Sequence, residues 1–224
     1  MQDLTNVIIP HFNKYPLITK KREDFLLFNY ALEIINKKEA KKPLTLEYIS
    51  KLISIKGAMN WGLSDVLKEA FPDIVPVLRP KMKLPLHIPP QWLSGFIDGE
   101  GCFYILVSKS KSYRTGASVQ LQFSITQHSR DIELMAKIKD FLGCGFLKIK
   151  KNQPCIDFVV TRFIDIQNII LPLLQNNPLQ GAKSQDYLDF IKVAEIIKNK
   201  AHLTDEGLDK ILNIKNTMNK KRKS

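Results

Sequence analysis

Two acidic residues stand at the end of a segment that is expected to be helical, WLSGFIDGEGCF at residues 92–103. Asp98 and Glu100 are followed directly by Gly101, which favours the end of the helix at that point. Carboxylates at a helix C-terminus oppose the helix macrodipole and are unfavourable for stability. A bound cation would remove that penalty, so the pattern indicates a metal site. The residues alone leave a second interpretation open, an amphipathic helix whose acids are solvated.

The same segment carries Gly95 and Gly99, which are four residues apart and therefore lie on one face of a helix. Each glycine costs about 1 kcal/mol relative to alanine in a helix interior. Close packing of another helix against this face would offset that cost. Pro89 and Pro90 stand just before the segment, where proline suits the start of a helix. The pattern predicts a helix–helix seam with an acidic end.

The nine residues LSGFIDGEG resemble the signature of the LAGLIDADG homing endonucleases position by position. Identical positions are Leu93, Gly95, Ile97, Asp98 and Gly101, and mild replacements are Ser94, Phe96 and Gly99. Glu100 stands where the signature has its second acid. The resemblance implies an α+β fold with an αββαββα unit and a four-stranded antiparallel DNA-binding sheet. It also implies site-specific cleavage of double-stranded DNA.

The resemblance implies catalytic roles for Glu100, Gln127, Lys183 and Lys21. Glu100 matches the acid that brings Mg²⁺ to the scissile phosphates, and hard divalent cations suit phosphodiester cleavage. Gln127 matches a polar residue that orients the solvent network, and Lys183 matches a lysine that stabilises phosphoryl charge. Lys21 is the counterpart of Lys183 in an internal repeat. Asp98 is interpreted as a helix-end residue rather than a ligand, and each lysine could also be a plain surface charge.

The internal repeat relates residues 3–60 to residues 165–219. The recurring residues of the first copy are Asp3, Asn6, Pro10, Pro16, Lys21, Asp24, Phe28, Glu33, Met59 and Asn60. So many matches over a long span indicate a duplication. Each copy is expected to form three helices, the third capped by Thr45 or Thr204. The apolar stripe of the second helix, which includes Phe28, is expected to lie in the core.

From Pro90 onward the pattern predicts one helix, two strands, one helix, two strands and further helices. The expected strands cover residues 102–108, 118–127, 145–151 and 156–162. The predicted organisation is a helical remnant of a first unit (residues 1–60), a proline-rich connector (61–89), a complete unit (90–219) and a basic tail (220–224). Two-unit family members carry the signature twice. This chain is therefore expected to need a homodimer across the glycine face, or a missing N-terminal half.

Alternating polar residues on the predicted strands are expected to read DNA, because alternate residues of a strand face one side of a sheet. The predicted DNA-binding residues are Ser108, Lys109, Lys111, Tyr113, Arg114, Gln120, Gln122, Ser124, Lys148, Lys150 and Thr161. A solvated outer face would show a similar pattern.

The composition favours a polyanionic partner, because 34 basic and 22 acidic residues give a net charge of +12. Three cysteines without a CxxC pair argue against a disulfide scaffold or a zinc site. No apolar run approaches the ~20 residues of a membrane span, so no membrane partner is expected. The N-terminal residues lack signal and transit patterns, so a mitochondrial protein would be encoded in the organelle, or its targeting segment would lie outside this chain.

The leading hypothesis is an intron-encoded, metal-dependent homing endonuclease. The rival hypothesis is a non-catalytic nucleic-acid-binding protein, either a maturase for intron RNA or an RNA-binding subunit of a mitochondrial particle that contacts ribosomal RNA. The same basic sheet could serve either nucleic acid. A helical-repeat module that binds proteins leaves the acidic helix end unexplained.

Overall fold

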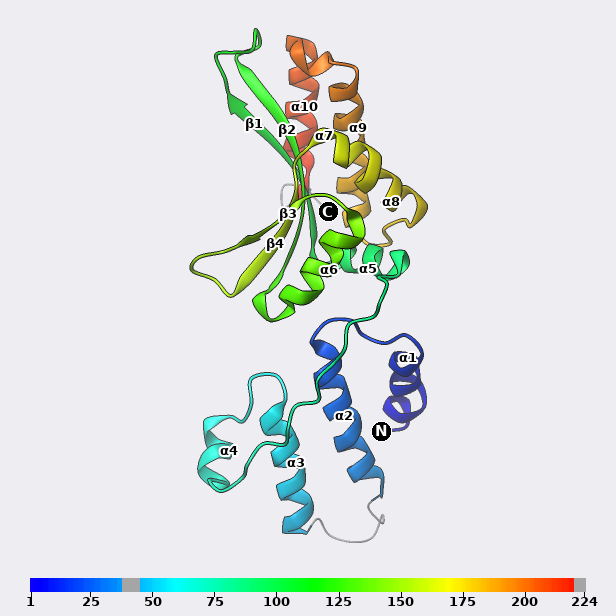
Figure 1. Cartoon of the computed structure of the whole chain (residues 1–224), viewed down its shortest axis with the longest axis vertical. Helices are drawn as coiled ribbons and strands as arrows, with labels where there is room; N and C mark the ends of the chain where they lie inside the picture. Colours follow the sequence, from blue (N-terminus) through cyan, green and yellow to red (C-terminus); the bar gives the residue numbers. More distant parts are fainter. Residues whose placement is uncertain (38–44, 220–224) are drawn as a thin grey trace. The chain divides into compact units, whose positions relative to one another are not determined.

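The computed structural model describes residues 1–37 and 45–219 (Figure 1). The predicted basic tail at residues 220–224 lies outside the described residues. The chain divides into two compact units, Met1–Pro85 and Leu86–Ser224. Each unit is described by itself below.

The second unit contains the predicted order of helices and strands. Its elements are α5 (Pro90–Glu100), β1 (Gly101–Lys109), β2 (Ala117–His128), η2 (Ser129–Asp131), α6 (Ile132–Leu142), β3 (Phe146–Ile149), β4 (Cys155–Val160), α7 (Phe163–Asp165), η3 (Ile166–Ile170), α8 (Leu171–Asn176), α9 (Lys183–Lys198), η4 (Ala201–Leu203) and α10 (Asp205–Thr217). The α+β fold class and the αββαββα order are confirmed. The fourth strand is shorter than predicted and ends at Val160, so the placement of Thr161 on that strand is wrong.

The four strands form one antiparallel sheet in the order β1-β2-β4-β3. Helices pack on one face of this sheet, with α5 and α9 on β1 and α6 on β4 (Figure 1). The core lies between these layers and includes Phe103, Phe123 and Phe158, whose side chains are fully buried. The Phe123 ring lies 5.5 Å from the Phe103 ring and 6.4 Å from the Phe158 ring. The other face of the sheet carries the alternate, mostly polar residues of each strand.

The connection from α6 to β3 depends on two glycines with positive φ. Gly143 ends α6 in the left-handed conformation at φ 64°, as expected for a residue after a helix C-terminus. Gly145 has φ 73°, and a Cβ atom there would lie 2.6 Å from the carbonyl oxygen of Val159. Only glycine lets β3 turn this closely against β4.

The first unit consists of η1 (Leu4–Ile8), α1 (Ile9–Lys14), α2 (Lys21–Lys37), α3 (Leu46–Ala58), α4 (Asp65–Ala70) and an extended segment that leads to Pro85. The extended segment packs on α3, because the backbone N–H of Val77 donates to the Ser54 carbonyl at 3.1 Å. Much of the proline-rich stretch that the sequence predicts as a separate connector is therefore grouped with the helical unit.

Arg79 ties this extended segment to α2. Its guanidinium donates to Glu23 at 2.8 Å, to Asp24 at 2.7 Å and to the Ala58 carbonyl at 2.7 Å. Burial by itself would raise the pKa of Glu23, but hydrogen bonds from Arg79 and Lys20 outweigh burial and lower that pKa. Glu23 is therefore an ionised partner that holds the segment in place near neutral pH.

The two copies of the repeat share atomic detail. In the first copy the backbone N–H of Asn60 donates to Asp24 Oδ1, and in the second that of Asn219 donates to Asp186 Oδ1, both at 3.0 Å. Both asparagines have positive φ, at 47° and 56°. The predicted caps are also present, since the side chains of Thr45 and Thr204 each accept a backbone N–H at the start of the third helix.

The copies differ in how they bury the second helix. Phe28 of α2 is 36% exposed, whereas its counterpart Phe190 in α9 is fully buried and lies 5.3 Å from the Phe103 ring of β1. The expectation that the Phe28 stripe is core is therefore only partly met. Leu32, on the same helix, is buried at 5% exposure, but Ile35 is 42% exposed. The described part of the first unit has no sheet to cover this face.

The core position Phe123 provides a test of the packing. Phe123→Ala should lower the free energy of unfolding by about 3–5 kcal/mol, because it leaves a cavity between two rings and the helices. Chemical denaturation followed by circular dichroism measures this loss. Phe141→Ala is the matched control, since Phe141 is 43% exposed on α6 and its loss should cost about 1 kcal/mol or less. Equal losses for the two variants would contradict the assigned core.

Candidate active site and nucleic-acid interface

Glu100 is the last residue of α5, and its side chain is exposed. The chain passes from α5 into β1 without an intervening loop, because β1 begins at Gly101. A Cβ atom on Gly101 would lie 2.6 Å from the Ile97 carbonyl oxygen, so only glycine fits this tight junction. The junction fixes the Glu100 backbone between a packed helix and a core strand. The Glu100 side chain therefore extends from a fixed backbone position and is open to solvent.

Asp98 binds the loop before α9. Its Oδ2 accepts the backbone N–H groups of Gln180 at 3.0 Å and Gly181 at 2.6 Å. A Cβ atom on Gly181 would lie 2.9 Å from Asp98 Oδ1, so the loop can approach this closely only with glycine. These contacts fit the interpretation of Asp98 as a helix-end residue, because its carboxylate already serves as an acceptor within the unit.

Lys183 is the first residue of α9, and its ammonium lies at the C-terminal end of α5. Its Nζ donates to the carbonyl oxygens of Gly99 at 3.0 Å and Ile97 at 3.3 Å. A cation at this end of α5 is favoured by the helix macrodipole, which compensates for its unfavourable position at the start of α9. The ammonium is therefore anchored beside the peptide that leads into Glu100. The structure thus gives Lys183 specific partners instead of a free surface position.

Burial raises the pKa of the Cys102 thiol, and the Lys183 ammonium acts in the opposite direction. The Cys102 Sγ atom lies 3.9 Å from Asn219 Oδ1, and the Asn219 side-chain amide donates to the Phe103 carbonyl at 3.1 Å. Asn219 therefore joins the end of the repeat to the start of β1. Cys102 is a protonated packing residue of this junction.

Gln127 lies near the end of β2, two residues beyond Ile125, whose partner across the sheet is Gly101. It is therefore at the same end of the sheet as the junction that holds Glu100. Its position alternates with that of Thr126 and places it on the helix-facing side, opposite Ile156. Its Oε1 accepts the backbone N–H of His128 at 2.8 Å.

Lys21 occupies the start of α2 in the first unit, as Lys183 does at the start of α9. Its Nζ donates to Asn60 Oδ1 at 3.0 Å and lies 3.7 Å from Asp24 Oδ2. Lys183 and Asn219 bind a signature helix and a strand, whereas Lys21 and Asn60 bind each other. The first unit thus has the same lysine and asparagine as the second copy of the repeat, but their side chains have different partners.

The glycine face of α5 is open. Gly95 and Gly99 are exposed, and no atom of the described residues lies within 4 Å of a Cβ built on either one, apart from the local backbone. Trp92 and Phe96 flank this face and stack with their ring centroids 4.9 Å apart. Beside it, Asp98 Oδ1 is buried without a hydrogen-bond partner among residues 1–37 and 45–219. Among the described residues no helix packs on this glycine face, so the helix–helix seam stays a prediction.

The outer face of the sheet carries five of the eleven predicted DNA-binding residues. On β2, Gln120, Gln122 and Ser124 alternate with buried core residues and lie opposite Leu106, Tyr104 and Cys102 of β1, respectively. Ser108 is paired with Ser118 near the hairpin end, and Lys148 of β3 is paired with Asp157 of β4.

The remaining predicted residues lie at the margins of this face. Lys109 is the last residue of β1, at a position that alternates with that of Ser108. The hairpin turn after β1 contains Lys111, Tyr113 and Arg114, and Lys150 directly follows β3. Thr161 follows β4 and lines a small pocket beside the α6–β3 turn. Tyr104 and Asp157 are not among the predicted DNA-binding residues, but the alternation of their strands places both on the outer face.

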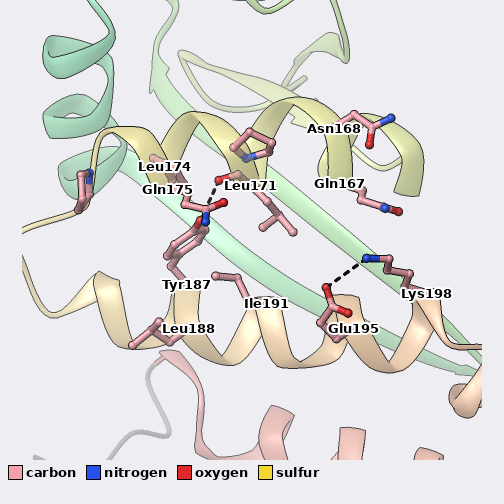
Figure 2. Close-up of a pocket in the computed structure, with 12 residues that line it drawn as sticks. Gln167, Asn168, Leu171, Leu174, Gln175, Tyr187, Leu188, Ile191, Glu195 and Lys198 are labelled. Atoms are coloured by element: carbon pink, nitrogen blue, oxygen red, sulfur yellow. Dashed lines mark hydrogen bonds and ion pairs between the residues drawn. The ribbon is translucent and has the colours of Figure 1, made fainter.

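A pocket of about 550 Å³ opens between α8 and α9 (Figure 2). Figure 2 shows its apolar floor, with Leu171, Ile191 and Tyr187, and the Glu195–Lys198 pair at one end, 3.8 Å apart. The Tyr187 hydroxyl donates to the Leu171 carbonyl at 2.8 Å. No predicted catalytic or DNA-binding residue lines this pocket.

The donor groups around Glu100 fit one half of a hard-cation site. Mg²⁺ is bound by oxygen ligands, commonly one or two carboxylates together with water and substrate phosphates. Glu100 offers an exposed carboxylate, but Asp98 is engaged by the loop and the Gly99 carbonyl is engaged by Lys183. Across the described part of the chain, no three His, Cys, Asp or Glu side chains converge as a metal cluster. Glu100 is therefore one carboxylate ligand for such a cation, and water, substrate phosphate or a further carboxylate would have to complete the site.

Among the described residues, no helix has the length and apolar character needed to cross a membrane.

Comparison with known proteins places these features in a family. The profile of the family described as LAGLIDADG endonuclease matches residues 1–32 and 93–194. A curated relative from Neurospora crassa, "Probable intron-encoded endonuclease 2", is 40% identical over 226 residues. That alignment covers 96% of this chain and 48% of the relative, so the chain spans about half of the relative's length.

Two solved structures of the I-SmaMI homing endonuclease show the same fold. One, bound to cleaved DNA, has a TM-score of 0.95 and 43% identity, covering 99% of this chain and 73% of the other. A second, bound to uncleaved DNA in the presence of calcium ions, has a TM-score of 0.93 and 42% identity, covering 98% and 74%. This chain belongs to the LAGLIDADG endonuclease family, and the resemblance of its signature is confirmed.

Asp98 allows a test of the helix-end contacts. Asp98→Ala should lower the free energy of unfolding by about 1–3 kcal/mol, because two backbone N–H groups lose their acceptor. Urea titration of both proteins gives the difference. Asp140→Ala is the control, since the Asp140 side chain is 72% exposed and pairs only at the surface with Lys139. A variant as stable as the control would contradict a structural role for Asp98.

Proposed function

We propose that this chain is part of a site-specific homing endonuclease that cuts both strands of DNA with Mg²⁺ or another hard divalent cation. The observation that carries the proposal is Glu100, exposed at the end of a glycine-faced helix with Lys183 anchored on the same helix end. The relatives named as endonucleases support the same activity. The gene, by the same argument, lies within an intron, and we propose a mitochondrial genome as its location.

The divalent cation, when bound, would supply Lewis-acid stabilisation and an activated water for phosphodiester hydrolysis. In this proposal Glu100 provides the anionic ligand. Lys183 places a positive charge where negative charge develops on the phosphoryl oxygens. Gln127 orients the water network near the β1 start, and Lys21 provides the corresponding charge for the second strand. Each helix-end group would be held rigidly, so little reorganisation accompanies the reaction.

Recognition of double-stranded DNA is assigned to the outer face of the sheet. Its side chains offer hydrogen-bond donors and acceptors for base edges, while lysines at its margins suit phosphates. The net charge of +12 favours association with the polyanion.

The proposed site is completed by a second signature helix. The open face at Gly95 and Gly99 would allow helix backbones to approach closely, which brings a second carboxylate beside Glu100. Either a second copy of this chain or a different segment with the same signature could supply it. The exposed Phe28 of the first unit, whose counterpart is covered by a sheet, supports a segment that also brings a sheet.

The role of Glu100 can be tested by Glu100→Gln. Cleavage of a target duplex with Mg²⁺ should fall by at least about 100-fold, because the amide binds a hard cation poorly. Binding of the same duplex, followed by fluorescence anisotropy, should change less than about threefold. Glu133→Gln, at an exposed position of α6, is the charge-matched control and should cut normally. Cleavage by Glu100→Gln at the control rate would refute the metal role.

The glycine seam gives a prediction for oligomeric state. If a second copy completes the site, light scattering should report about twice the 25.7 kDa mass of the chain. Gly95→Leu should then yield a monomer, because its side chain would block the approach of the other helix. The variant should fold at least as stably, since leucine is the better helix former and the space around a Cβ at this position is open. A wild-type chain that is already monomeric would assign the second helix to another segment.

A further inference from the structure

Asp157 is the one acidic residue in the four strands of the sheet, all of which lie within the described residues. It stands on β4 between the buried residues Ile156 and Phe158, so its side chain points to the outer face. That face is otherwise neutral or basic. A carboxylate on this face is electrostatically unfavourable for binding a phosphate backbone.

Two neighbouring side chains fix the orientation of this carboxylate. The Thr126 hydroxyl donates to Asp157 Oδ1 at 2.7 Å, and the Lys150 ammonium lies 3.3 Å from the same oxygen. Both contacts engage Oδ1, and no other hydrogen bond or ion pair from the described residues reaches the carboxylate. The side chain is 14% exposed, and Oδ2 is left without a hydrogen bond or ion pair from the described residues.

A fixed carboxylate on a DNA-reading surface suits one kind of base-edge group. Carboxylates repel phosphates but accept hydrogen bonds from the N4 amino group that cytosine presents in the major groove. Lys150 offsets the charge and limits the cost of bringing the carboxylate close to DNA. Because the carboxylate is held in place by Thr126, little side-chain entropy is lost when a base binds.

We propose that Asp157 is a specificity-determining residue that accepts a hydrogen bond from the N4 amino group of a cytosine in the target. This inference rests on the proposed DNA-binding function. It assigns to Thr126 the role of a positioning residue, which acts through Asp157 and does not itself touch the base.

The test is selection of duplexes from a randomised library by the full chain, followed by affinity titration of the selected sequence and its single-base variants. The wild type should favour cytosine at one position by at least about fivefold. Asp157→Asn should lose that preference and favour adenine there, because asparagine pairs with adenine through both of its polar atoms. Asp140→Asn, which removes the same charge from the far side of α6, should leave every base preference unchanged.

Thr126→Val provides a second variant with Asp157 intact. It should weaken the cytosine preference at the same position without changing the preferred base, because the carboxylate loses its orienting hydrogen bond.

A uniform change of affinity in Asp157→Asn, with all base preferences intact, would overturn the inference and leave only a charge effect. The inference is equally overturned if Asp157→Asn and Asp140→Asn behave alike. If the wild type itself selects no sequence, the proposed function fails together with this inference. If the wild type selects a sequence that Asp157→Asn reads identically, only the inference fails.

Discussion

The unit that carries the signature depends on the contacts between the C-terminal end of α5 and the start of α9. The C-terminus of α5 leaves carbonyl groups and two carboxylates with unfavourable electrostatics. Lys183 binds two of the carbonyls, and Asp98 accepts two N–H groups from a loop more than 80 residues away. These contacts neutralise the helix end locally and fix α9 against it. Glu100 can then remain exposed, and no hydrogen bond or ion pair from the described residues engages its carboxylate, which suits the metal-ligand role proposed for it.

The internal repeat shows which of these contacts occur in both copies. Both copies retain the aspartate that receives a backbone N–H from a left-handed asparagine. In the second copy the asparagine side chain continues to β1, and in the first it binds Lys21. The geometry of this pair is thus common to both copies, whereas the Phe28 face stays exposed because the described part of the first unit has no sheet to cover it.

The sheet separates two tasks by alternation. Inward residues such as Phe123 hold the helices, and outward residues are free to be polar without loss of core packing. The charge on the outward face is not uniform, because Asp157 is paired with Lys150 on a surface that is otherwise neutral or basic. A surface of lysines alone would bind phosphates without regard to sequence. In the proposed DNA-binding function, an oriented acceptor among them would add a group that responds to the identity of a base.

The signature helix, the four strands, the threonine caps at Thr45 and Thr204 and the helix end at Gly143 could all be predicted from the sequence, because periodicity and capping depend on neighbours in the chain. Folding in three dimensions was needed to show that Asp98 binds the α9 loop, that Lys183 closes α5, and that the proline-rich segment packs on α3 through residues such as Val77. The end of β4 before Thr161 and the pairing of Asp157 with Thr126 also emerged only there. Those features depend on strand register and on contacts between distant residues, which no local pattern of side chains encodes.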